Sequence, residues 1–497
     1  MTISIRKGAL LTEACDLLVI GVFEGNVDKD VASLDALFGG DVRKLLVREG
    51  FTGKQNERQV FPSFGHSPAK KVLLVGMGSR ADFSTDMIRR VGGAAARCAR
   101  TIKATQVCMS LIGAGVRGIR PEQAAQALGE GLRLGWYTFH TYQAPKPAAA
   151  MPEVTVMVED RSVIRAAEKG LARAAVLADA TAFARDLVNT PSHHMHPGKM
   201  AEVAQTLVTR GRIRCKVLSR EMMEKMGMGA TLAVGDGSAH QPVGIHLTYT
   251  PPRAPKRRVA VIGKAVTFDS GGLNLKPEQG MTTMKIDMAG AATVLGLFKA
   301  LAALNVPVEV HGLFLAVENM PSGSAYRPGD IVRAMNGTTI EILNTDAEGR
   351  LTLADALSYA VAKVKPDVMV DLATLTGAAV VALGDDITAI MGNHPATVKG
   401  LREASVRAGE HTWELPLFAP YDEAIKSGIA DINNTGGRSA GTIKAGLFLQ
   451  RFVGETPWAH LDIAGPSYCE KETRPDLPLG GTGWGVRTLM EWLEQMA

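Results

Sequence analysis

The stretch NTDAEGRLTLADAL, residues 344–357, places three charges immediately before an amphipathic helical pattern. Asp346, Glu348 and Arg350 alternate with small or apolar residues on a turn that contains glycine. A single short polar side chain is enough to cap a helix. Capping therefore accounts for one carboxylate at most, and the second carboxylate and the guanidinium need another explanation.

More charged residues lie upstream, in the segments GKAVTFDSGGLNLKP and MKIDMAGAA. Lys264 directly follows the apolar run VAVIG, and Asp269 comes before two glycines that permit close backbone approach. Lys276 follows, and Asp287 stands just ahead of an apolar helical pattern. Strand C-termini and helix N-termini lie at the same edge of a parallel α/β sheet, where ligands bind. All these charges are therefore expected at one rim.

Four carboxylates at one rim repel each other unless cations lie between them. Taken singly, Asp287, Asp346 or Glu348 could each be a helix N-cap, and Lys264 could be a surface lysine, so both interpretations stay open for each residue. Taken together with Asp269, they are better explained by two divalent ions. Oxygen-rich ligands suit Mn²⁺ or Mg²⁺, with Zn²⁺ as an alternative. Such a pair activates water and polarises a carbonyl or phosphoryl oxygen.

Composition limits the classes of protein that this chain can belong to. It has 497 residues, of which 46% are hydrophobic and 21% charged, as in globular proteins of more than one domain. A net charge of +5 gives little support for nucleic-acid binding, and the basic run RAPKRR, residues 253–258, is expected to be a solvated loop. The five cysteines form no CxxC pair, which argues against a disulfide scaffold and a thiolate zinc site.

The N-terminal stretch, residues 1–23, has only a short apolar run and is expected to form a first strand, not a signal peptide. No uninterrupted apolar run is long enough to span a membrane. We therefore expect a soluble, cytoplasmic protein without a membrane partner.

Strand-like and helical runs alternate along the chain, which predicts parallel strands with helices on both faces. We expect two α/β domains, the second larger, catalytic and built on a central, mostly parallel sheet flanked by helices. The expected parts are an N-terminal domain (1–160), a connecting helix (161–189) that ends before Pro191 and Pro197, and a C-terminal domain (190–497). Strands are expected at 16–23, 71–78, 106–113, 153–160, 258–265, 308–317 and 368–377, and helices at 87–104, 288–305 and 351–364.

These charged segments closely resemble the leucyl aminopeptidase (cytosol aminopeptidase) family of dimetal exopeptidases. The resemblance continues through DLATLTGAAVVALG, DINNTGGRSAGTIKAGLFLQ, WAHLDIAGP and GTGWGVRTL, covers residues 185–497, and is most specific in NTDAEGRL. The first 160 residues resemble the variable N-terminal domain of the family, which is macro-domain-like, mainly in being an α/β domain.

The resemblance implies a role for each charged residue. Asp269 and Glu348 would bridge two metal ions, Mn²⁺ or Zn²⁺ or also Mg²⁺, and a metal-bridging water would attack the peptide bond. Lys276 would stabilise the oxyanion, and Arg350 would hold a bicarbonate that shuttles the proton. The remaining metal ligands would be Lys264 and Asp287 at one ion and Asp346 at the other. As a ligand, Lys264 must be neutral, which requires a strongly lowered pKa next to the ions.

The implied activity is release of the N-terminal residue, leucine and other mainly apolar residues, from short peptides. Met284, Thr374, Leu375 and Gly377 fall where the family lines the pocket for that residue, although core packing explains Met284 and Leu375 equally well. A homohexamer is implied as well. An alternative is an additional DNA-binding regulatory role, as in some bacterial members, but the near-neutral charge weighs against a nucleic-acid partner.

One segment departs from the family pattern. SHHMHP brings His193, His194 and His196 together where relatives usually carry other residues. A further zinc site there is an alternative that we do not favour, because the metal centre of the family uses no histidine.

Overall fold

The computed structural model, which describes residues 1–144 and 150–496, forms two compact units. Both units combine parallel strands with helices, so the predicted fold class of two α/β domains is confirmed. In chain order, the first unit comprises residues 1–179 and 471–479, and the second comprises residues 180–470 and those from 480 onward.

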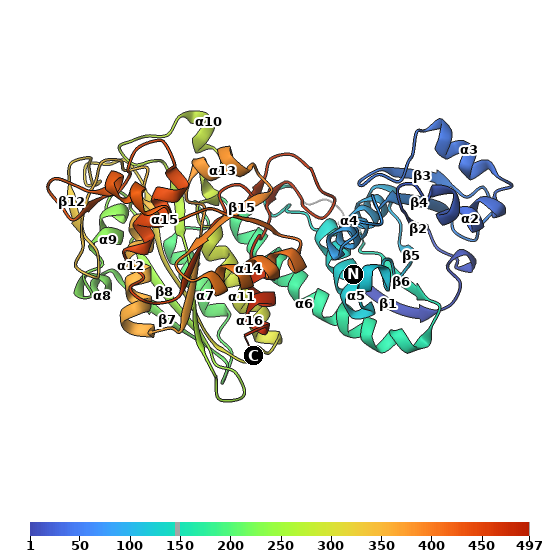
Figure 1. Cartoon of the computed structure of the whole chain (residues 1–497), viewed down its shortest axis with the longest axis horizontal. Coiled ribbons are helices and arrows are strands. Elements are labelled where there is room, and N and C mark those ends of the chain that lie inside the picture. Colours follow the sequence, from blue (N-terminus) through green and yellow to red (C-terminus); the bar gives the residue numbers. More distant parts are fainter. Residues whose placement is uncertain (145–149, 497) are drawn as a thin grey trace. The chain divides into compact units, whose positions relative to one another are not determined.

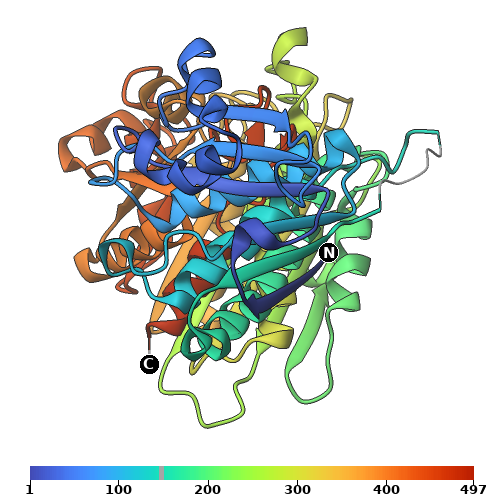
Figure 2. The same cartoon turned by 90° about the vertical axis from the view of Figure 1, so that its right-hand side faces the viewer.

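The first unit contains a six-stranded sheet in the order β1-β6-β5-β2-β4-β3. Neighbouring strands are parallel except at the edge, where β3 runs antiparallel to β4. The strand expected at 16–23 is confirmed as β2, and a separate strand that was not expected, β1, lies ahead of Glu13 and Asp16, which interrupt the apolar pattern. The strands, in blue and cyan in Figure 2, are β1 (Thr2–Lys7), β2 (Leu17–Val22), β3 (Arg58–Pro62), β4 (Lys71–Gly76), β5 (Gln106–Ser110) and β6 (Glu153–Val158).

Helices α4 (Thr85–Ile102) and α5 (Pro121–Trp136) pack against each other in the first unit, through faces rich in alanine and glycine. Their buried side chains join those of the sheet in one hydrophobic core. The other helical elements of this unit are α1 (Val27–Asp30), α2 (Ala32–Leu37), α3 (Asp41–Arg48) and the 3-10 turns η1 (Leu10–Thr12), η2 (Val116–Gly118) and η3 (Arg161–Val163).

A long helix, α6 (Ile164–Asn189), occupies the stretch predicted as a connecting helix. It ends two residues before Pro191, and Pro197 begins the next helix, α7 (Pro197–Thr206). Both prolines act as expected, since proline cannot continue a helix but suits its first turn.

The second unit is built on a sheet in the order β16-β15-β18-β14-β9-β11-β8-β7, with β10 added beside β11. The centre, from β18 to β11 together with β10, is parallel. Antiparallel pairings occur toward both edges, at β15–β18 and at β11–β8–β7. The strands are β7 (Ile213–Leu218), β8 (Val243–Tyr249), β9 (Arg258–Gly263), β10 (Ala265–Asp269), β11 (Glu309–Asn319), β14 (Val368–Ala373), β15 (Ile387–Gly392), β16 (His411–Glu414) and β18 (Trp458–Asp462).

Helices cover both faces of this sheet (Figure 1). Ala260 and Ile262 of β9 join the core beneath α12 and α15, and the alternate residues Val259 and Val261 are equally buried toward the other face. This two-sided burial explains the continuous apolar runs of the central strands. The helices are α8 (Arg220–Lys225), α9 (Gly229–Gly235), α10 (Glu278–Met281), α11 (Ala289–Ala303), α12 (Gly349–Tyr359), α13 (Gly377–Leu383), α14 (Pro395–Ala408), α15 (Gly441–Gln450) and α16 (Val486–Glu494).

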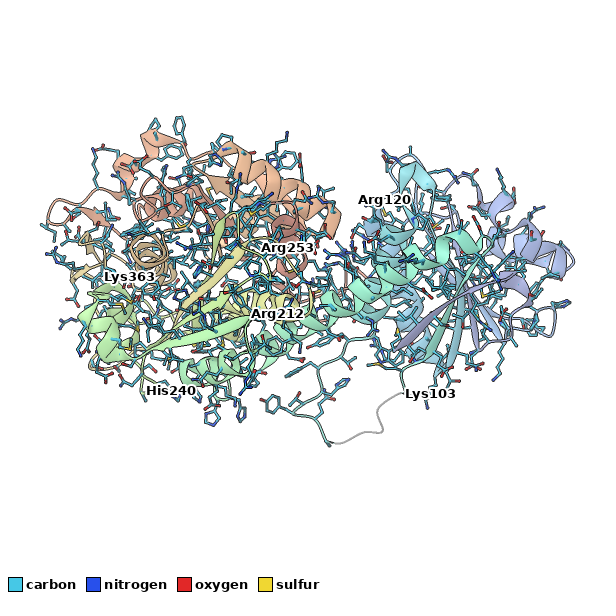
Figure 3. All side chains as sticks on the ribbon, turned by 90° about the horizontal axis from the view of Figure 1, so that it is seen from below. Lys103, Arg120, Arg212, His240, Arg253 and Lys363 are labelled. Atoms are coloured by element: carbon cyan, nitrogen blue, oxygen red, sulfur yellow. The ribbon has the colours of Figure 1, made fainter. Side chains whose placement is uncertain are left out.

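The basic run at 253–258 is exposed, as predicted, and leads into β9, whose first residue is Arg258; Arg253 is labelled in Figure 3. Among the described residues, one helical stretch, residues 278–303, could cross a membrane by length and composition alone. It is not an uninterrupted apolar run, because it contains Glu278, Lys285, Asp287 and Lys299, and 83% of its apolar 18-residue window is buried inside the fold. The remaining elements are η4 (Met284–Ile286), the π-helix η5 (Ala360–Val364), η6 (Ala419–Ile425), β12 (Ile331–Arg333), β13 (Thr339–Glu341), β17 (Ile432–Asn433), β19 (Tyr468–Cys469) and β20 (Gly480–Gly481).

Candidate metal centre

Lys264 lies between β9 and β10 and is only 3% exposed. Its Nζ contacts Asp287 Oδ1 at 2.7 Å and Glu348 Oε1 at 2.9 Å, and it donates to Thr374 O at 2.9 Å. Gly349 makes this approach possible, because a Cβ there would lie 2.4 Å from Lys264 Cε. The lysine therefore joins three segments that are far apart in the sequence.

Asp269 ends β10, and Lys276 connects it to the turn before α12. Lys276 Nζ contacts Asp269 Oδ2 at 2.8 Å and Asp346 Oδ1 at 2.5 Å. One carboxylate oxygen from each of Asp269, Asp346 and Glu348 lies within 4.8 Å of the other two. Among the described residues, these three form the one group of His, Cys, Asp or Glu side chains close enough to hold a metal ion through three ligands. The predicted convergence of carboxylates is confirmed.

Two buried oxygens of this centre, Asp287 Oδ2 and Glu348 Oε2, have no hydrogen-bond partner among the described residues. Both residues are buried, at 4% exposed for Asp287 and 1% for Glu348. A buried carboxylate oxygen without a partner is unfavourable unless a cation or a hydrogen bond satisfies it. The donor set, carboxylate oxygens with one amine, fits divalent ions such as Mn²⁺ or Zn²⁺.

The centre combines four carboxylates with two lysines, so its acidic groups outnumber its basic groups. Burial raises the pKa of Asp269, Asp287 and Asp346, and neighbouring carboxylates raise it further. Burial alone would lower the pKa of Lys264 and Lys276, but attraction to the carboxylates outweighs it, so the pKa of each lysine is raised. A bound dication would favour the ionised carboxylates and compete with the proton for the lone pair of Lys264.

Arg350 lies in the first turn of α12 and has few partners. It is 8% exposed, its Nε has no hydrogen-bond partner, and Nη1 makes only a 3.5 Å contact with Thr435 O. Burial lowers the pKa of Arg350 to about 10, although Glu348 and Asp462 oppose the shift. A buried guanidinium with unpaired donors suits a planar oxyanion, and bicarbonate is one.

The charged residues before α12 and α11 do not cap these helices. Glu348 occupies the N-cap position of α12, but its side chain makes no capping hydrogen bond. The N-cap position of α11 is occupied by Met288, not by Asp287, and it has no side-chain capping bond either. Glu348 and Asp287 contact Lys264 instead, and Asp346 contacts Lys276. The carboxylates therefore do not serve as helix caps. This agrees with the expectation from the sequence that capping could not account for all of them.

The residues expected to line the substrate pocket follow β14 or precede Asp287. Thr374 Oγ1 donates to Asp287 Oδ1 at 2.8 Å, so Thr374 touches the centre directly. Leu375 follows it, and Met284 opens η4, three residues before Asp287. A Cβ at Gly377 would meet no heavy atom within 4 Å, which leaves open space at the start of α13.

Asp462, at the end of β18, organises this segment, and the sequence reasoning missed it. Its Oδ1 accepts from Leu375 N at 3.1 Å, and its Oδ2 accepts from Thr376 Oγ1 at 2.6 Å. Burial raises the pKa of Asp462. The available signal was a carboxylate at the end of a buried strand in which His460 is the other polar residue, because a buried carboxylate is retained only where it has partners.

Two further buried polar residues, Asp371 and His460, were also missed. His460 Nδ1 contacts Asp371 Oδ1 at 2.6 Å, and Trp458 Nε1 donates to Asp371 Oδ2 at 2.7 Å. Burial alone would lower the pKa of His460, but Asp371 raises it overall. These residues fix β14 against β18, and the charge of Arg350 acts to lower the pKa of His460.

The histidines of the SHHMHP segment make ring contacts and a helix cap. His193 and His194 form an edge-to-face pair with ring centroids 5.1 Å apart. His196 Nδ1 accepts from Lys199 N at 3.4 Å, which caps α7, and its ring stacks on His240 at 4.4 Å (Figure 3 labels His240). Among the described residues, they do not form a group of three possible ligands.

Known families and proteins resemble this chain along its length. Residues 182–490 match the catalytic domain of the cytosol aminopeptidase family, and residues 19–146 match the N-terminal domain of the same family. A probable cytosol aminopeptidase of Geobacter sulfurreducens is 44% identical over 498 residues, which covers 99% of each chain. One from Thermosynechococcus vestitus is 46% identical over 486 residues, with 96% of each chain covered.

Solved structures agree with these matches. A mutant of tomato leucine aminopeptidase is 33% identical, with a TM-score of 0.90 over 100% of this chain and 96% of its own. The bottromycin maturation enzyme BotP in complex with Mn is 36% identical, with a TM-score of 0.84 over 97% of this chain and 100% of its own.

Proposed function

The chain belongs to the cytosol aminopeptidase family, and from this premise we propose that it is a two-metal leucyl aminopeptidase acting on short peptides. Its activity would be the release of N-terminal leucine and other mainly apolar residues. Membership makes it an aminopeptidase-family hydrolase; the leucyl preference, the residue roles and the assembly are the proposal.

One observation carries the proposal. Asp269, Asp287, Asp346 and Glu348 meet in a largely buried centre, and two of its carboxylate oxygens have no hydrogen-bond partner in the part of the chain that the structure describes. Such a set is unfavourable without bound cations, and it lies at the carboxyl edge of a parallel sheet, where α/β proteins bind their ligands.

We assign Asp269 and Glu348 as the bridging ligands, with Lys264 and Asp287 completing one metal site and Asp346 the other. The contacts of Lys264 Nζ with Asp287 Oδ1 and Glu348 Oε1 support this assignment, because all three groups meet at one point. The ions, Mn²⁺ or Zn²⁺ with Mg²⁺ as an alternative, would activate a water molecule and polarise the peptide carbonyl. The match to a structure in complex with Mn supports Mn²⁺.

Lys276 and Arg350 would act on charge and proton transfer. Lys276 is held by two carboxylates, which keep it protonated and ready to donate to the oxyanion that develops on the carbonyl. Arg350 would hold a bicarbonate that shuttles the proton. Its buried Nε has no hydrogen-bond partner among the described residues, so this donor is available to the anion.

The first residue of the peptide would occupy the space bounded by Met284, Thr374, Leu375 and Gly377. Gly377 leaves that space open, and Asp462 holds the main chain of Leu375 in place. A mainly apolar residue would fit against Met284 and Leu375, which provide apolar surface.

We also propose a cytoplasmic homohexamer. The number six comes from the family resemblance. Four large apolar side chains of the second unit offer exposed surface for such contacts: Val381 at 90%, Val406 at 68%, Ile429 at 65% and Trp413 at 60%.

A metal-reloading experiment tests the proposed function. Metal-stripped protein is reloaded with Mn²⁺, Zn²⁺ or Mg²⁺ and assayed on a panel of aminoacyl amides, with N-acetyl-leucine amide as the blocked control. We expect hydrolysis only after reloading, leucine amide to rank first, and the blocked amide to resist. Full activity with at most one ion per chain by elemental analysis, or cleavage of the blocked amide, would contradict the proposal.

A further inference from the structure

Asn319, the last residue of β11, is not a candidate ligand, yet its side chain lies inside the metal centre and is 1% exposed. Its Nδ2 donates to Asp269 Oδ1 at 2.8 Å and to Thr345 O at 2.9 Å. The carboxylate stands at the end of β10, and the carbonyl directly precedes Asp346. One amide group thus joins the two segments that carry most of the ligands.

The main chain and surroundings of Asn319 fix the direction of this amide. Asn319 pairs with Asp269 across β10 and β11, and its carbonyl accepts from Ser270 N at 3.0 Å and from Ser270 Oγ at 2.7 Å. On the opposite side, Gly272 has a φ of 63°, and a Cβ there would lie 2.8 Å from Asn319 Oδ1. The close packing leaves the side chain little room to rotate.

We propose that Asn319 is a positioning residue that orients the Asp269 carboxylate for metal binding and sets its distance from the turn that carries Asp346 and Glu348. Asp269 Oδ1 also accepts from Gly271 N at 2.8 Å, so two donors fix one oxygen while Oδ2 faces Lys276. An amide suits this role, because its two N–H donors point in fixed directions and it adds no charge.

The inference rests on the proposed metal site. Groups that hydrogen-bond to a metal ligand orient that ligand, and their loss typically costs about 10–100-fold in metal affinity. Removal of Asn319 should have an effect of this size, because it frees Asp269 and loosens the Asp346 turn at the same time.

Calorimetric titration of the metal-stripped, full-length protein with Mn²⁺ tests this role without an activity assay. Asn319→Leu has a similar volume and removes both donors, and we expect its Kd for Mn²⁺ to rise by about 10–100-fold. Asn319→Ser is smaller, cannot reach both acceptors, and provides a second variant if the leucine variant does not fold. It should weaken Mn²⁺ binding in the same direction.

Asn434→Leu is a matched control. Asn434 is fully buried and its Nδ2 donates to Asn344 O at 2.7 Å, so it supports the same turn but contacts no carboxylate of the centre. Its Kd for Mn²⁺ should change by less than about threefold, well below the effect of removing a group bonded to a ligand.

Wild-type affinity in either Asn319 variant, or an equal loss in Asn434→Leu, would overturn the positioning role. A wild-type protein that binds no Mn²⁺, Zn²⁺ or Mg²⁺ would instead contradict the proposed function itself, so the two failures are distinguishable.

Discussion

Replacement of Lys276 by alanine separates charge stabilisation in the transition state from metal binding. Its side chain is 17% exposed and its Nζ lies 2.8 Å from Asp269 Oδ2 and 2.5 Å from Asp346 Oδ1. In the metal-free protein, loss of this ammonium leaves Asp269, whose side chain is 3% exposed, without its cation, which destabilises the fold by about 3–5 kcal/mol; Asp346, at 34% exposed, adds little because solvent screens it.

Metal binding should respond in the opposite direction. An ammonium beside the ligand oxygens repels a dication, so Lys276→Ala should bind Mn²⁺ at least as tightly as the wild type. Mn²⁺ should therefore raise the unfolding temperature of the variant by more than it raises that of the wild type. Calorimetric titration and thermal unfolding, each with and without Mn²⁺, measure both effects.

Catalysis, in contrast, should be strongly impaired. Removal of one preorganised donor to an oxyanion typically lowers kcat by about 10²–10³, or about 2.7–4 kcal/mol. Lys285→Met is a suitable control, because Lys285 Nζ donates to Asn189 O at 2.8 Å and is not part of the carboxylate centre. Lys285→Met should change the free energy of unfolding more than it changes kcat.

Two results would refute this reasoning. Loss of Mn²⁺ affinity by tenfold or more in Lys276→Ala would mean that the lysine organises the ligands, since its charge alone cannot favour a dication. A raised KM with unchanged kcat would mean that it binds the substrate equally in the ground and transition states.

Further predictions concern metal loading, specificity, pH dependence and assembly. Glu348→Ala should lose metal and activity together, measured by elemental analysis and amide hydrolysis; an active variant with two ions would contradict the bridging role. Gly377→Val should fill the open space beside α13 and raise KM for leucine amide by about tenfold but less for alanine amide, as expected for about 1–3 kcal/mol of pocket contact; equal KM values for both would remove Gly377 from the pocket. Burial raises the pKa of Asp355 to about 7, so its stabilising proton is fully bound below the unfolded pKa of about 4 and is lost as the pH rises through 7. The free energy of unfolding of the wild type, relative to Asp355→Asn, should therefore fall by about 2–3 kcal/mol between pH 5 and pH 8 in denaturant titrations, and a pH-independent difference would disprove the shift. Light scattering at micromolar concentration should give about six chain masses, as the family resemblance implies, and a fully active monomer would contradict the hexamer.

Local sequence determined much of this protein. The apolar runs of the central strands and the glycines and charges at their ends are local patterns, and they located β9, β14, α11 and α12 within a few residues. They also placed Lys264, Asp269 and Glu348 at the same rim, because the carboxyl ends of parallel strands share one edge. The resemblance in NTDAEGRL then gave each charge a candidate role, which remains a proposal.

Tertiary structure decided what the pattern of single residues does not encode. Asn319 meets Asp269 across 50 residues of sequence, and Asp462 meets Leu375 across 87, only because β11 pairs with β10 and β18 with β14. The antiparallel edge strands and the packing of residues 471–479 within the first unit likewise depend on partners that are distant in the chain. The periodicity of apolar residues indicates which residues are buried and whether they lie in a helix or a strand. Their hydrogen-bond partners, in contrast, are set by strand order and register. The sequence therefore identified the charges of the centre, and only the fold showed which buried neighbours hold them in place.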